Sequence, residues 1–121
     1  MVENKLVSIL ESLDLEQEYD VMLQGTLSSQ DYEPENYFTY WCWDNARGEF
    51  YDNKPNKNDV GYQIIAYSTD RNFLIKMMKE AIKKLEVNDF IIDDDEIDVA
   101  SNDKIHTAKM IDVYFILKKE E

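Results

Sequence analysis

The chain has 121 residues, of which 26 are acidic and 13 basic, and its formal net charge is −13. This charge argues against binding to nucleic-acid phosphates and against docking on anionic lipid. It is compatible with plain solubility, with a basic partner, or with a surface that lies near DNA and must not adhere to it. Apolar residues make up 44% of the chain and aromatic residues 12%. We therefore expect one folded domain over residues 1–121, with residues 1–2 and 118–121 frayed.

The single cysteine, Cys42, rules out an intramolecular disulfide and a thiolate metal cage. It lies between Trp41 and Trp43, where a small buried thiol is a simpler interpretation than a nucleophile. The sequence carries no apolar run near the ~18 residues of a membrane span and no leader pattern. We expect a soluble protein made in a reducing compartment, with no membrane partner.

The first third of the chain predicts a helix followed by a strand. Apolar residues at three- and four-residue spacing predict a helix over residues 3–13. Residues 20–26 (DVMLQGT) predict a strand, and the polar residues 27–36, which include Pro34, predict a loop.

The most distinct strand signal is residues 37–43 (YFTYWCW), which are aromatic or β-branched at almost every position. Because Thr39 is the one polar residue, we expect a strand covered on both sides. A turn at residues 44–48 and a return strand beginning at 49–52 follow. The polar residues 52–59 then predict a protruding loop, and residues 60–67 (VGYQIIAY) a further strand.

The strongest helix signal follows the capping residues 68–70. Its apolar stripe has spacings of one and three residues and consists of Phe73, Leu74, Met77, Met78, Ala81, Ile82 and Leu85. Residues 90–99 and 108–117 predict two more strands. The fold class is therefore α+β, in the order α-β-β-β-α-β-β, with a mainly antiparallel sheet and two helices packed on one face.

The search for chemistry finds no complete site. The acidic run of Asp93, Asp94, Asp95 and Glu96 lies near His106, the one histidine, but it lacks the central glycine of an EF-hand loop. No nucleophile motif and no glycine-rich phosphate loop is present, since the three glycines are isolated. We predict no catalytic residues, no metal and no cofactor, and hence a protein that is not an enzyme.

Five short segments carry a resemblance to a known group of proteins. They are residues 38–41 (FTYW), 51–53 (YDN), 67–70 (YSTD), 98–102 (DVASN) and 106–107 (HT). In this order they resemble the tail terminator or head–tail joining proteins of tailed phages and prophages of Gram-positive bacteria. Together with the intervening residues, the resemblance covers about residues 23 to 117.

The resemblance implies a structural virion protein located at the head-proximal end of the tail, and in the host cytoplasm during assembly. Such a protein forms a homo-hexameric ring that caps the tail tube and joins it to the head connector, while DNA passes through without specific binding. The acidic run Asp93, Asp94, Asp95 and Glu96 is then the candidate channel surface, because an acidic wall repels DNA. The candidate subunit or connector interface consists of Trp41, Trp43, Arg47, Tyr51, Asp52, Asn53 and His106.

Two alternatives remain open from the sequence. The chain could be a neighbouring neck or head-completion protein, because such proteins have similar sizes and positions. It could also be an acidic DNA mimic that inhibits a nucleic-acid enzyme. The acidic residues are divided among several segments, which fits the mimic poorly.

Overall fold

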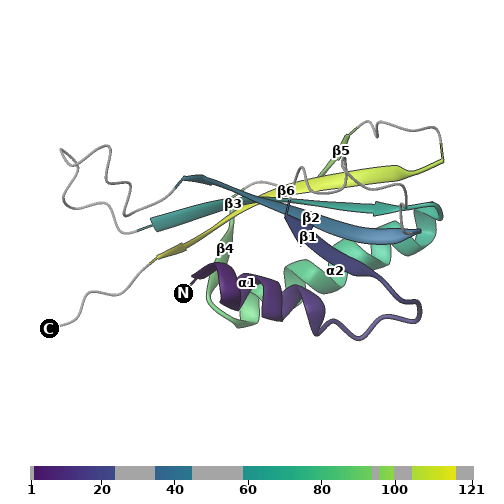
Figure 1. Cartoon of the computed structure of the whole chain (residues 1–121). Helices are drawn as coiled ribbons and strands as arrows, with labels where there is room; N and C mark the ends of the chain where they lie inside the picture. Colours follow the sequence, from purple (N-terminus) through teal and green to yellow (C-terminus); the bar gives the residue numbers. More distant parts are fainter. Residues whose placement is uncertain (1, 24–34, 45–58, 94–95, 100–104, 117–121) are drawn as a thin grey trace, which may run out of the picture.

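The structure is a computed structural model that describes residues 2–23, 35–44, 59–93, 96–99 and 105–116. Figure 1 shows two layers, a twisted sheet and a pair of helices below it. The elements in chain order are α1 (Val2–Glu11), β1 (Asp20–Leu23), β2 (Asn36–Asp44), β3 (Asp59–Ser68), α2 (Arg71–Val87), β4 (Phe90–Ile92), β5 (Ile97–Val99) and β6 (Thr107–Ile116). The α+β class and the predicted element order are confirmed.

The sheet has six strands in the order β1-β2-β3-β6-β4, and β5 also pairs with β6. The pairing of β1 with β2 is parallel, and the other pairings are antiparallel. β3 pairs with β6 along its whole length, so β4 and β5 share the opposite edge of β6. The prediction of a mainly antiparallel sheet is thus confirmed.

The predicted strand 90–99 is divided into two short strands. Both pair with β6, β4 opposite Val113–Phe115 and β5 opposite Ala108–Met110. The acidic residues 93–96 fall between them. Aspartate has a low strand propensity, and the two described strands end at Ile92 and begin at Ile97, on either side of the acidic run.

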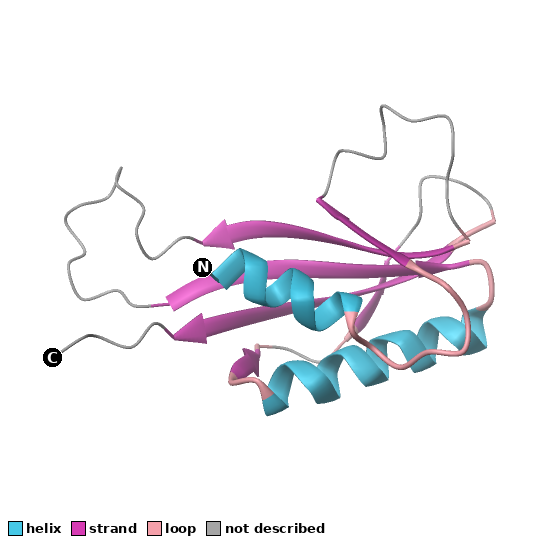
Figure 2. Ribbon diagram, turned by 60° about the horizontal axis from the view of Figure 1, so that its bottom comes forward, coloured by secondary structure: helices cyan, strands magenta, loops and turns pink. Residues whose placement is uncertain are grey.

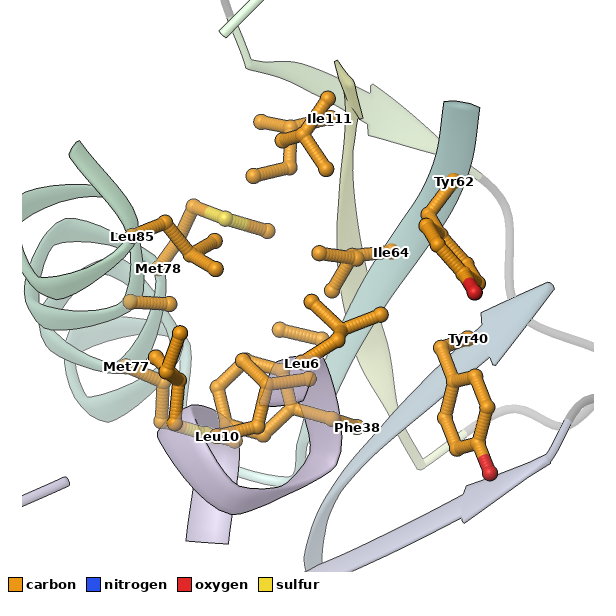
Figure 3. Packing of buried hydrophobic residues seen from close by; sticks show 14 of the residues in the cluster. Leu6, Leu10, Phe38, Tyr40, Tyr62, Ile64, Met77, Met78, Leu85 and Ile111 are labelled. Carbon is orange, nitrogen blue, oxygen red and sulfur yellow. The ribbon is translucent and has the colours of Figure 1, made fainter. Parts of the chain in front are cut away.

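Both helices pack against the same face of the sheet, as predicted (Figure 2). Alternate residues of β2, β3 and β6 point toward them, because successive side chains of a strand face opposite sides. Figure 3 shows side chains from α1, α2 and the sheet meeting in this core. Its fully buried members include Leu6, Leu10, Phe38, Ile64, Leu74, Met77, Met78, Leu85 and Val113.

Capping residues set both ends of α2. Asp70 is the N-cap, and its side chain accepts a hydrogen bond from the Asn72 backbone N–H at 3.0 Å. At the other end, the Asn88 side chain donates to the Lys84 carbonyl at 2.8 Å. Asp89 then adopts a positive φ of 75°, which aspartate tolerates better than most residues and which turns the chain into β4. The described part of the chain contains no helix long and apolar enough to span a membrane.

Candidate interaction site

Three of the five segments that carry the resemblance, 67–70, 98–102 and 106–107, have described residues at one end of the sheet. Tyr37 at the start of β2 stacks on Tyr67 at the end of β3, with ring centroids 4.5 Å apart. The ring of His106, just before β6, meets Tyr37 edge-on at 5.4 Å. The antiparallel register also pairs Ser68 with Thr107. Segments up to 69 residues apart in sequence are therefore neighbours here, and we call Tyr37, Tyr67, His106, Arg71, Asp98 and Thr107 the sheet-end cluster.

Ion pairs extend this cluster across α2, β5 and β6. The Arg71 guanidinium donates to the Asp98 carboxylate at 2.9 Å and to the Thr107 hydroxyl at 3.1 Å. Lys109 contacts the same Asp98 carboxylate at 3.0 Å and Glu96 at 3.4 Å. The hydrogen bond from Arg71 and then that from Lys109 lower the pKa of the Asp98 carboxyl. These ion pairs thus link β5 to α2 and to β6.

The lowered pKa of Asp98 can be measured directly. Because the folded-state pKa lies below the unfolded value, the ion pairs hold β5 at neutral pH and are lost as the pH falls through the folded pKa. We expect Arg71→Gln to raise the pKa of Asp98 toward the ordinary value near about 3.9. A carboxyl ¹³C NMR titration measures it. Lys76→Gln, which removes the 3.4 Å pair with Glu16 instead, is the matched control and should leave Asp98 unchanged. An equal pKa in wild type and Arg71→Gln would contradict this assignment.

The candidate channel residues are only partly within the described chain. Asp93 is exposed at the end of β4, and its backbone N–H donates to the Asp112 carbonyl at 2.8 Å. Glu96 is half-buried, and its carboxylate lies against Lys109 rather than standing alone. Asp94 and Asp95 lie outside the described residues. The run therefore consists of at least two different environments, not one uniform acidic wall.

The candidate interface residues are also divided. Trp41 is 48% exposed on the sheet face away from the helices, next to Gln63 of β3. Trp43 belongs to β2 at an irregularity in the ladder with β3, and its side chain is outside what the structure describes. Arg47, Tyr51, Asp52 and Asn53 lie in the segment 45–58, which is likewise not described.

His106 is placed inside the domain rather than on its surface. Its ring is 7% exposed and lies beside Tyr37. In the isolated chain it therefore supports the sheet-end cluster from within, and Tyr67 is the most exposed of the three rings. The expectation of a strand covered on both sides holds for the first half of β2, where Tyr37 to Tyr40 are buried, and fails at the exposed Trp41.

A second group of polar residues was not identified from the sequence. Asn36, assigned to a loop, opens β2 and is buried, and its side chain accepts a hydrogen bond from the Ser68 hydroxyl at 2.7 Å. Its amide nitrogen donates to Gln17 Oε1 and to the Glu18 carbonyl, both at 3.1 Å. The Ser68 hydroxyl accepts from the Asp70 N–H at 3.0 Å. This network ties the start of β2 to the N-cap of α2.

An acidic surface pocket of about 650 Å³ opens between α1 and β1. Its lining includes the carboxylates Glu11, Glu16, Glu18 and Asp20. Among the described residues, no three His, Cys, Asp or Glu side chains are grouped closely enough to hold a metal ion. The pocket is thus a charged recess formed by the α1–β1 connection. This connection is held to α1 by a hydrogen bond of 2.6 Å that the Tyr19 hydroxyl donates to the Leu10 carbonyl.

Comparison of the chain with protein-family models and with curated proteins gives no match.

Proposed function

We propose that this chain is a structural virion protein that assembles into a ring of six copies and caps the head-proximal end of a phage tail tube. The ring would end tube polymerisation and present a surface to the head connector. DNA would pass through it without specific binding, as the net charge of −13 favours. The protein would act in the virion after assembly in the host cytoplasm.

One observation carries this proposal. Three of the segments that resemble tail terminators lie far apart in the sequence and supply Tyr67, Asp98, His106 and Thr107 to the sheet-end cluster. Within it Tyr37 contacts the rings of Tyr67 and His106, and Arg71 pairs with Asp98. Segments that resemble one family by chance have no reason to adjoin in space. A second observation agrees with an assembly role, namely that Trp41 and other large apolar residues are exposed on the sheet face without helices.

The charge distribution disfavours the DNA-mimic alternative. A mimic should present carboxylates across one face, whereas α2 carries five basic and two acidic residues over its 17 positions. Its outward-facing Lys79 and Lys83 are exposed. A DNA-binding enzyme would meet a basic helix on this side of the molecule.

The test is binding to tail tubes. We expect the purified chain to co-sediment with tubes assembled from the tail-tube protein of the same phage, and to appear by electron microscopy as a ring at one tube end. Light scattering should give six copies, either in solution or after release from tubes. A chain that stays monomeric and ignores tubes would contradict the proposal. Tight, salt-sensitive inhibition of a DNA-cleaving enzyme would favour the mimic instead.

A further inference from the structure

β1 is an outer strand of the sheet. It ends the strand order and pairs with β2 on one side, and no described strand lies beyond it. Alternate residues of an edge strand direct their backbone N–H and C=O groups outward, where a further strand can pair with them. Outside the ladder with β2, Asp20, Val21 and Met22 make no backbone hydrogen bond to a described residue. The outer side of β1 therefore offers hydrogen-bonding groups to an added strand.

The acidic pocket between α1 and β1 adjoins this outer strand. Its volume is about 650 Å³, and Val21 and Met22 of β1 are part of its lining. Leu15 and Val21 are half-buried and pack against the core, while Glu11 and Glu18 are exposed in the same lining. A lining of apolar groups and carboxylates matches a lysine or arginine side chain, whose apolar stem ends in a positive charge.

The connection that forms the pocket has charges of one sign only. All charged residues between positions 11 and 20 are acidic and exposed, namely Glu11, Asp14, Glu16, Glu18 and Asp20. Two lysines of α2 reach the connection, which lies beside that helix (Figure 2). Lys76 pairs with Glu16 at 3.4 Å, and Lys84 donates to the Ser12 carbonyl at 3.1 Å. The other carboxylates make no ion pair with a described residue, so a partner has to supply the compensating charge.

We propose that β1 and the acidic pocket bind an extended, basic segment of another protein. The segment pairs with the outer side of β1 as an added strand, and a lysine or arginine from it enters the pocket beside Glu11 and Glu18. In this mode of recognition, main-chain hydrogen bonds give affinity and side-chain pockets give specificity. A second copy of β1 is disfavoured as the added strand, because it would bring its own five carboxylates against these five. The proposal does not depend on the proposed function.

Binding of a designed peptide tests this surface. We expect a short, capped peptide of alternating lysine and valine to bind the chain and to shift the amide NMR signals of Asp20, Val21 and Met22. It should also slow hydrogen exchange at the outward-facing amides of β1. The same peptide with the amides along its pairing edge N-methylated keeps its charge but cannot add a strand, so it should not bind there. A peptide of alternating glutamate and valine should not bind either.

Two matched variants of the chain locate the charge. Glu11→Gln with Glu18→Gln should weaken binding of the lysine–valine peptide by about 5- to 30-fold, as expected when two exposed ion pairs are lost. Asp89→Asn with Asp93→Asn changes the net charge equally but flanks β4, at the opposite end of the strand order, and should bind the peptide nearly as wild type does. All four side chains are exposed, so both variants should fold.

Each contrary outcome overturns a stated part of the proposal. Equal binding of the plain and the N-methylated peptide would show that charge alone holds the peptide and would overturn strand addition. Equal weakening in the two double variants would overturn the pocket as the binding site. Protection of the β1 amides that rises with the concentration of the free chain would make a second copy the occupant and overturn the basic partner. A chain that caps tail tubes but ignores the lysine–valine peptide would lose this proposal and keep the proposed function.

Discussion

Met77→Asp is expected to unfold the domain, while Ile75→Asp on the same helix leaves it folded. Met77 is fully buried in the core (Figure 3), whereas Ile75 is 43% exposed on the outer side of α2. Removing the buried part of a methionine side chain costs about 2–5 kcal/mol, and a whole domain is stable by about 5–15 kcal/mol. The carboxylate adds the cost of a buried charge without a partner, which only protonation can relieve.

Near-ultraviolet circular dichroism and urea titration measure this effect. Wild type and Ile75→Asp should keep the fixed aromatic signals of the tyrosine-rich sheet and a cooperative transition, and Met77→Asp should lose both. A cooperative transition in Met77→Asp at the wild-type midpoint would show that the helix does not pack on this face of the sheet.

The sequence predicts the fold correctly in elements whose apolar residues follow one clear helical or strand periodicity. The stripe from Phe73 to Leu85 predicted α2 and its buried face, and six of its seven residues are buried while Ile82 is half-buried. The alternation within β6 likewise puts Ile111 and Val113 on one side of the strand, and both lie in the core. In both cases a side chain's burial follows from its position along one element, which local sequence determines.

The sequence-based prediction was incomplete where pairing between distant strands decides the structure. The division of residues 90–99 depends on which stretches of β6 are free to pair, and a single strand signal does not contain that information. Asparagine is a residue type typical of loops. The hydrogen-bond partner that Asn36 finds in the fold, Ser68, lies 32 positions later in the sequence. Its burial follows from the register of β2 with β3.

The residues of the candidate site could likewise be predicted only in part from the sequence. Trp41 could be selected from sequence because a tryptophan in an aromatic strand belongs either to the core or to a contact surface, and its exposure excludes it from the core. The Arg71–Asp98–Lys109 arrangement could not be selected, because its members come from α2, β5 and β6 and each is an ordinary charged residue in isolation. His106 drew attention as the one histidine, but contact with Tyr37 places it inside the domain.

The buried network around Asn36 gives the second large effect, and Asn36→Asp tests it without changing size. The amide nitrogen of Asn36 donates to two oxygens, on Gln17 and on the Glu18 backbone, and a carboxylate oxygen in its place would face both without a proton. Unpaired buried polar groups cost about 1–3 kcal/mol, and more when charged. We therefore expect Asn36→Asp to lose about 2–3 kcal/mol of unfolding free energy at pH 7.

The loss of unfolding free energy in Asn36→Asp should become larger as the pH rises. Burial opposite two acceptors disfavours the charged form, so the introduced carboxyl has a folded-state pKa above the unfolded value near about 3.9. The folded variant therefore binds its proton more tightly, and the difference in stability from wild type is smallest below that unfolded pKa and grows as the pH rises through the folded pKa. Urea titrations of both proteins between pH 3.5 and pH 7, chosen as roughly the span of a raised carboxyl titration, measure this difference.

Ser68→Ala provides the matched control, because it breaks the same network without introducing a titratable group. Its loss of stability relative to wild type should stay nearly constant over the same pH range, since the Asp70 N–H loses an acceptor and Asn36 a donor at every pH. A pH-independent loss in Asn36→Asp would mean that the introduced carboxyl reaches water. Asn36 would then be a surface residue, and the tie between β2 and the N-cap of α2 would not hold the sheet-end cluster in place.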